Sequence, residues 1–258
     1  MVAAAVHAAN RKIHEVWSFN YKDRLFVPPL VSLIDIDTAL AELEWVLAQG
    51  ARTLMLWMNP ACGRSPAEPY FDPFWARSVE SGAQITMHLG YNEFSKRGVE
   101  WGEPAREYMH YTAFQWIHYW CDRPAMEWVT AAIFHGLFER HPKVRVLLSE
   151  VGTVWVPYLV RKVDHAFFLG RQGTYDKITK RPSQTFREHF LVMPFPEENV
   201  DRVVDVVGAD PVVFGSDYPH SEGLPDPLAW VTQIKNLSET DQRKIMRDNL
   251  AGFLPLAP

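Results

Sequence analysis

The sequence predicts an α/β fold, a TIM-type (β/α)8 barrel represented here by about six strand–helix units. Short apolar runs alternate with segments of helical apolar spacing, which is typical of parallel βα units. Some runs, such as TLMLWM, are apolar nearly throughout, as expected for strands covered on both faces. A doubly wound sheet often carries a glycine-rich phosphate turn after its first strand, and this sequence has none. A barrel is therefore favoured, although six units are two short of closure.

The elements expected in the first part of the chain have recognisable ends. Prolines interrupt the first strand (RLFVPPLVSL), Gly50 ends the first helix, and Pro73 takes the first position of the second. The predicted order is strand 24–33, helix 38–50, strand 53–58, helix 72–82 and strand 84–89. A long insertion at 91–123, which contains Trp101, Trp116 and Trp120, then interrupts the alternation. Loops of this length tend to be functional, and its apolar character favours self-association into a homo-oligomer.

The alternation resumes after the insertion. Basic residues and Pro142 end the next helix, and the run VRVLLS follows as a strand. The predicted order is helix 124–140, strand 144–149, helix 154–168, strand 190–193, helix 197–208, strand 212–214, and helices 226–236 and 239–249. No repeat, low-complexity tract or flexible linker divides these elements, so we expect one domain over residues 1–258.

Composition excludes several classes of protein. A formal charge of −5 and a pI near 6.1 give no basic footprint for nucleic acid. No apolar run approaches the roughly 18 residues that a membrane span requires. The two cysteines, Cys62 and Cys121, are too few for a disulfide framework, so a cytoplasmic protein is the default expectation. A small molecule is the expected binding partner.

Polar side chains follow four of the predicted strands. Asn59 follows TLMLWM, His88 ends QITMH, Glu150 follows VRVLLS, and Asp217 follows VVFGS. Catalytic groups of parallel barrels lie at these carboxyl ends of the strands, so the set is more informative than any member. Three of them also have a structural interpretation: His88 as a core histidine, Glu150 as a carboxylate at a helix amino terminus, and Asp217 as a cap for the turn at Tyr218.

A carboxylate at the mouth of a barrel favours a metal. Desolvating Asp217 without a partner would cost several kcal/mol, whereas a divalent cation would stabilise it there. An imidazole nitrogen of His88 and the Asp217 carboxylate suit Zn²⁺ or Mn²⁺, which would lower the pKa of bound water to near 7. Asp217 could also act as general base, and nearby His220 could reach the same pocket. The residues Trp57, Tyr91 and Trp155 flank strand ends and, with Asn59, predict an aromatic-lined pocket for a planar acid.

Three stretches carry a resemblance to a known family. VVFGSDYPHSEG, QITMHLG and LFERHPKVRVLLSEVGTVWVPYLVRKVDH resemble the amidohydrolase-related (amidohydrolase 2) proteins, metal-dependent (β/α)8 barrels. This family includes enzymes similar to aminocarboxymuconate-semialdehyde decarboxylase and γ-resorcylate decarboxylase. The resemblance implies one divalent metal, held by His88 at the fifth strand and by Asp217 at the eighth. Glu150 stands where many members have a catalytic histidine, and one subgroup has S-E-x-G instead.

The resemblance also implies a missing part. Family members carry a D/E-x-H pair of metal ligands on their first strand, and no such strand is present here; His7 and His14 lie in a helix-like segment. The first two strands are therefore expected to be absent, which leaves two open sheet edges with unpaired backbone groups. Two ligands alone, His88 and Asp217, would hold a metal weakly, so the metal could be lost.

Three hypotheses for function follow. The first is a metal-dependent hydrolase or non-oxidative decarboxylase of a small aromatic or unsaturated carboxylate. The second is a catalytically impaired protein that serves in binding or assembly. The third is a metal-independent, lactonase-like hydrolase in which Asp217 activates water unaided. Metal analysis separates the first from the other two.

Overall fold

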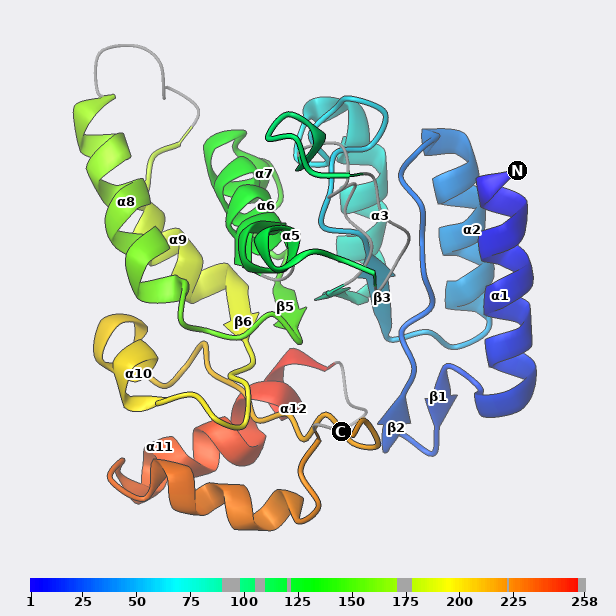
Figure 1. Ribbon diagram of the computed structural model, residues 1–258. Coiled ribbons are helices and arrows are strands. Elements are labelled where there is room, and N and C mark those ends of the chain that lie inside the picture. The colour runs from blue at the N-terminus through cyan, green and yellow to red at the C-terminus, as the bar shows by residue number, and fades with distance from the viewer. Residues whose placement is uncertain (90–97, 105–109, 120–121, 171–177, 222, 255–258) are drawn as a thin grey trace.

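A four-stranded parallel sheet forms the centre of the molecule (Figure 1). The computed structural model describes residues 1–89, 98–104, 110–119, 122–170, 178–221 and 223–254. The strands lie in chain order: β3 (Thr53–Leu56), β4 (Gln84–His88), β5 (Val146–Ser149) and β6 (Phe190–Val192). The α/β class and the parallel sheet predicted from the sequence are confirmed.

The first and last predicted strands join this sheet by one bridge each. Leu30 pairs with Met55 of β3, and Val212 pairs with Val192 of β6, both in parallel. The rest of the first predicted strand forms other structure, because β2 (Leu25–Phe26) turns back on β1 (Asn20–Tyr21) as a short antiparallel hairpin. The sheet therefore contains six parallel segments, of which the outer two are short.

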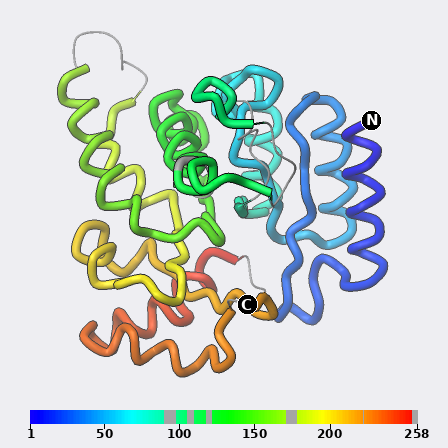
Figure 2. Tube along the Cα trace, viewed as in Figure 1, coloured from blue at the N-terminus to red at the C-terminus, as the bar shows by residue number. Residues whose placement is uncertain are grey.

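Helices surround the sheet, and those close in sequence lie side by side. In Figure 1, α1, α2 and α3 stand at the right, and α8 and α9 at the left. Figure 2 traces the chain from the blue amino-terminal helices to the orange and red carboxyl-terminal ones across the bottom. No helix in the described residues is long and apolar enough to cross a membrane. The bounds are α1 Val2–Trp17, α2 Ile36–Ala48, η1 Pro69–Phe71, α3 Asp72–Ser81, α5 Ala113–Tyr119, α6 Asp122–Phe134, α7 Leu137–Arg140, α8 Val156–Leu169, α9 Pro182–His189, α10 Asp201–Val207, η2 Pro227–Ile234, α11 Glu239–Arg243, the π-helical η3 Lys244–Asp248 and α12 Asn249–Phe253.

The side chains of the sheet lie on two faces with different packing. One row across the four strands consists of Leu54, Ile85, Val146 and Phe190, all at most 1% exposed within the main core. Burial of each such side chain contributes roughly 1.5–3 kcal/mol. The opposite face carries a smaller cluster, in which Phe253 of α12 packs with side chains of β6 and the last segment, Leu191 and Val213. His88 lies on this second face, because it is two residues beyond Thr86, which pairs with Leu147 of the same cluster.

The expected helix 124–140 is two helices. Gly136 has a left-handed backbone (φ 72°), a conformation that glycine adopts without steric penalty. It ends α6 and begins the single turn of α7. The sequence pattern missed this break, because the apolar spacing continues through it.

Contrary to expectation, the outward-facing backbone groups of the two outer segments are hydrogen-bonded at the positions where these segments bridge the sheet. Asn10 of α1 donates to the Leu30 carbonyl (2.7 Å) and accepts from the Leu30 N–H (3.0 Å), as a neighbouring strand would. At the other edge, Asn249 of α12 donates to the Val212 carbonyl at 2.7 Å. Asparagine can do this because its amide carries both a donor and an acceptor. Each edge is thus covered by a helix at the position where it bridges the sheet.

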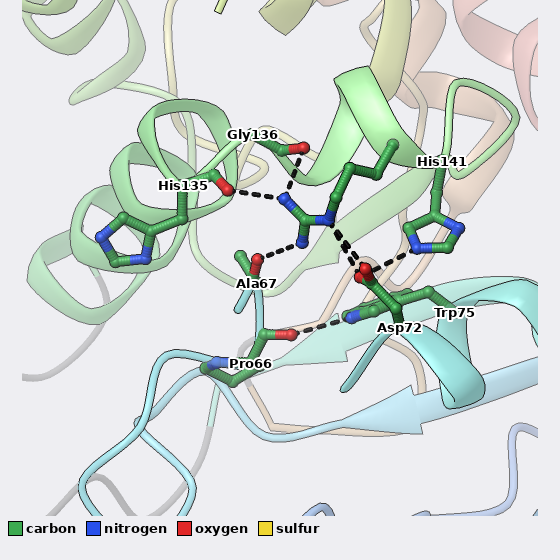
Figure 3. Close-up of polar contacts among 8 residues, drawn as sticks. Pro66, Ala67, Asp72, Trp75, His135, Gly136 and His141 are labelled. Carbon is green, nitrogen blue, oxygen red and sulfur yellow. Dashed lines mark hydrogen bonds and ion pairs between the residues drawn. The ribbon is translucent and has the colours of Figure 1, made fainter. Parts of the chain in front are cut away.

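A hydrogen-bonded network centred on Arg140 ties the loop after β3 to the helices (Figure 3). Its Nε lies 3.0 Å from both carboxylate oxygens of Asp72, to which His141 Nε2 also bonds at 3.0 Å. The Arg140 Nη atoms donate to three backbone carbonyls, those of His135 (2.8 Å), Gly136 (2.9 Å) and Ala67 (2.6 Å). One planar guanidinium therefore connects α3, the end of α6 and the loop that follows β3.

We expect Arg140→Ala to lower the free energy of unfolding by about 2 kcal/mol, because it leaves carbonyls and Asp72 without their charged partner. The site is part-buried, which moderates the loss. Urea denaturation of purified protein measures it. Arg140→Lys keeps the charge but has no planar fork, so it should recover only part of the loss. Full recovery by lysine would show that charge alone matters.

Candidate active site

The site forms at the carboxyl ends of β4 and β5, where register brings two predicted residues together. His88 pairs with Ser149, so Glu150 is the next residue along the neighbouring strand. His88 Nε2 lies 2.6 Å from Glu150 Oε2, and its Nδ1 lies 2.7 Å from the Leu89 carbonyl oxygen. Both ring nitrogens of His88 are thus engaged within the protein.

Asp217 and His220 reach the same place on a tight loop. His220 Nδ1 lies 3.2 Å from Asp217 Oδ1, and the His220 N–H donates to the Asp217 carbonyl at 2.9 Å. Gly223 closes the loop against Asp217, because a Cβ there would lie 2.5 Å from the Asp217 carbonyl oxygen. The Tyr218–Pro219 peptide bond within the loop is cis. The GSDYPHSEG stretch therefore positions both functional groups locally.

Three side chains from two distant parts of the chain converge here. Ligand atoms of Glu150, Asp217 and His220 all lie within 4.8 Å of one another. Since β6 separates β5 from the Val212 segment, a flat sheet would hold the two strand ends about 10 Å apart, twice the usual strand spacing. The Glu150 side chain and the loop that carries Asp217 together bridge this separation.

The electrostatics of the site favour a cation. The hydrogen bond to Glu150 raises the pKa of His88 above its ordinary value; burial opposes this, and the Leu89 carbonyl and the Asp217 charge add to it. A histidine whose charged form is stabilised reports a strongly negative environment. Glu150, 8% exposed, supplies much of that negative charge.

The donor set suits a divalent metal. Two carboxylates and one imidazole are ligands that both Zn²⁺ and Mn²⁺ accept, and three protein donors are usual for a catalytic zinc. Asp217, predicted as a metal ligand, belongs to this group. His88, the second predicted metal ligand, is not in the group but bonds to its member Glu150. Glu150 and His220 supply the other two donors.

The described residues that were predicted to bind substrate lie outside the group formed by Glu150, Asp217 and His220. Trp57 and Asn59 line a cavity of about 710 Å³, together with residues of α1 and of the Leu30 segment. The Oδ1 atom of Asn59 is buried and accepts no hydrogen bond from the described residues. Trp155 is 3% exposed, and its indole N–H donates to the Val151 and Gly152 carbonyls. Tyr91 lies outside the described residues.

Comparison with known proteins places the chain in a family. The amidohydrolase family profile matches residues 1–256. The chain belongs to the amidohydrolase family. This confirms the resemblance that the SDYPH and SEVG stretches indicated.

Individual relatives of this amidohydrolase chain are longer than it is. The 2-amino-3-carboxymuconate-6-semialdehyde decarboxylase of Dictyostelium discoideum is 23% identical over 76% of this chain and 51% of its own length. A solved amidohydrolase from Mycobacterium avium subsp. paratuberculosis is 32% identical, with a TM-score of 0.88 over 97% of this chain and 64% of that one. A dihydroxybenzoic acid decarboxylase from Polaromonas, solved with bound manganese and 2-nitroresorcinol, is 17% identical, with a TM-score of 0.69 over 97% of this chain and 76% of that one. The chain thus spans half to three quarters of these proteins.

Two residues with structural roles, Glu198 next to the candidate site and Asn10 at the sheet edge, were not found by sequence reasoning. Glu198 bonds to Thr153 behind the site, and Asn10 covers the sheet edge. Neither follows a predicted strand, so the strand-end rule could not find them. Their roles depend on contacts between segments 45 and 20 residues apart.

Proposed function

We propose that this chain carries the metal-holding rim of an enzyme that hydrolyses or non-oxidatively decarboxylates a small aromatic or unsaturated carboxylate. The observation that carries this proposal is the convergence of Glu150, Asp217 and His220 within 4.8 Å. Clustered carboxylates at a strand-end rim are unfavourable unless a cation or proton meets them.

Glu150, Asp217 and His220 would hold the metal, and a bound divalent ion would supply Lewis acidity toward a substrate carboxylate or a water molecule. Manganese is bound by the Polaromonas decarboxylase, and carboxylate oxygens suit that ion. His88 hydrogen-bonds the outer oxygen of Glu150 and so fixes the direction of its carboxylate. His88 is therefore assigned an orienting role in place of the ligand role that the family resemblance implied, because both of its ring nitrogens are engaged within the protein.

Proton transfer is assigned to the Asp217–His220 pair. In a non-oxidative decarboxylation, the C–C bond to the carboxylate breaks, CO₂ leaves, and a proton takes its place on carbon. His220 Nδ1 lies 3.2 Å from an Asp217 oxygen; since this nitrogen cannot carry a proton while it binds a metal, the Asp217 carboxylate would hold the proton and pass it to a bound molecule. In a hydrolysis, the same pair would take the proton of the attacking water.

The cavity at the carboxyl end of β3 is consistent with an aromatic or otherwise planar substrate. Trp57 offers a partly exposed ring, and Asn59 also lines the cavity. Both residues follow β3, the neighbour of the strand that carries His88. The decarboxylase names of the relatives are consistent with such an acid.

A second candidate is metal-independent hydrolysis. Two imidazole–carboxylate pairs, His88–Glu150 and His220–Asp217, are already formed by protein atoms alone. Such a pair can act as a general base on water without a metal.

Metal titration with a turnover assay tests both candidates. We expect purified protein to bind one Mn²⁺ or Zn²⁺ in calorimetry and to release CO₂ from a hydroxybenzoate or an unsaturated amino acid semialdehyde only when metal is present. Lactone hydrolysis that survives a chelator would favour the second candidate. A protein with neither metal binding nor turnover would overturn both and favour a role in binding or assembly.

A further inference from the structure

The turn that carries Glu150 has a backbone that needs support. Glu150 has φ 54° and Gly152 has φ 61°, both in the left-handed region. For a glutamate this conformation is unfavourable by about 1–2 kcal/mol, and it persists only where surrounding contacts hold it. The turn lies between β5 and α8, so its conformation decides where the Glu150 carboxylate points.

Glu198 holds this turn from behind. It comes from the segment between β6 and α10, and its carboxylate accepts the Thr153 N–H at 3.0 and 2.8 Å. The Thr153 hydroxyl donates to the same carboxylate. Gly152 lies directly against it, because a Cβ there would sit 2.3 Å from Glu198 Oε1. Only glycine therefore fits between Glu198 and the turn.

Trp155 holds the other side of the turn. Its indole N–H lies 3.0 Å from the Val151 carbonyl oxygen and 3.1 Å from that of Gly152. The ring is 3% exposed, so these contacts are shielded from water. One acceptor side chain and one donor side chain thus fix residues 151–153, directly after Glu150.

Burying the Glu198 carboxylate costs free energy, which indicates that its position beside the turn contributes to the structure. Burial raises the pKa of this carboxyl, and the hydrogen bonds from Thr153 oppose the shift. Its contacts are with Thr153 and Gly152, whereas the metal-competent group consists of Glu150, Asp217 and His220.

We propose that Glu198 is a positioning residue for Glu150: by binding Thr153 it holds the left-handed turn that points the Glu150 carboxylate at Asp217 and His220. The expected effect of Glu198 on metal binding rests on the proposed function, whereas its expected effect on the conformation of the turn is independent of that function.

Three variants test this role in the full chain. Glu198→Ala removes the acceptor, Glu198→Gln keeps an amide oxygen for the Thr153 N–H, and Glu197→Ala changes the exposed neighbouring acid as a control. We expect Glu198→Ala to weaken Mn²⁺ binding about 10-fold, the lower end of the effect of losing a group that bonds a ligand directly, because Glu198 acts on Glu150 through the turn. Exchange of the Thr153 amide proton, followed by NMR, should accelerate relative to amides of β5. Glu198→Gln and Glu197→Ala should stay near wild type in both measurements.

The two measurements separate the possible failures. Wild-type protein that binds no Mn²⁺ would overturn the proposed function, while Thr153 exchange still tests the turn. Wild-type affinity and unchanged exchange in Glu198→Ala would overturn the positioning role. If Glu198→Ala does not fold, Thr153→Val removes only the hydroxyl donor and Thr153→Ser restores it. Weaker Mn²⁺ binding in the valine variant and recovery in the serine variant would support the proposal, and equal affinities would contradict it.

Discussion

Asp217→Asn is expected to weaken Mn²⁺ binding about 100-fold or more and to remove metal-dependent turnover. Loss of an outer-shell partner alone lowers metal affinity about 10–100-fold, so loss of a direct donor should reach at least the upper end of that range. The substitution keeps the shape of the side chain but removes its charge, which leaves Glu150 and His220 as donors of the group. Two protein donors are fewer than a catalytic zinc site normally uses. Calorimetric titration with Mn²⁺ and a CO₂-release assay measure the two effects.

The matched control is Asp205→Asn, an exposed acid on α10. It makes the same change of charge outside the cluster, so its Mn²⁺ affinity should equal that of the wild type. Urea denaturation of both variants shows whether a loss of metal binding is a loss of folding. Wild-type Mn²⁺ affinity in folded Asp217→Asn protein would contradict the assignment of Asp217 as a ligand.

Asn10→Ala is expected to lower the free energy of unfolding by about 3 kcal/mol, because it leaves the part-buried N–H and carbonyl of Leu30 without their partner and removes a hydrogen bond to Glu42. Asn10 is fully buried and bonds to the N–H and carbonyl of Leu30 and to Glu42 Oε1 at 2.8 Å. Alanine fills none of these roles, and the edge of the sheet then has an unpaired N–H and C=O. For a chain of this size the melting temperature should fall by about 6–12 °C, since each kcal/mol corresponds to about 2–4 °C.

Lys12→Ala, an exposed change on the same helix, is the control and should alter stability by less than about 0.5 kcal/mol. Gel filtration adds a second readout, because an uncovered strand edge pairs readily with another chain. Asn10→Ala protein should therefore form larger species at concentrations where the control variant does not. Equal urea midpoints for Asn10→Ala and Lys12→Ala would show that the edge contacts contribute little.

Much of the site could be predicted because it obeys a local rule. Parallel strands present their carboxyl ends at one edge, so the polar residue after an apolar run is a candidate wherever the run is recognised. This rule identified His88, Glu150 and Asp217, and the structure brings all three to one place. The predicted helix 72–82 similarly matches α3 closely, because Pro73 and Gly82 mark its ends.

Other features could not be read from local patterns. The hairpin of β1 and β2 takes residues from a predicted strand, and Trp155 is buried although its position in the sequence suggested a pocket wall. The break at Gly136 is hidden by continuous apolar spacing. In each case, a contact with a distant segment or a backbone conformation outweighed the pattern of the neighbouring residues.

By itself, the sequence determined the parallel α/β class and which side chains stand at the strand ends, since both follow from periodicity and from the direction of parallel strands. Only the tertiary structure decided how those side chains meet. The approach of Asp217 to Glu150 depends on the pairing of the Val212 segment with the sheet and on the loop that follows it. The engagement of His88 Nε2 depends on strand register, and the covering of the edge by Asn10 depends on helix packing. Each of these joins residues far apart in the chain, and local sequence carries no information about such distances.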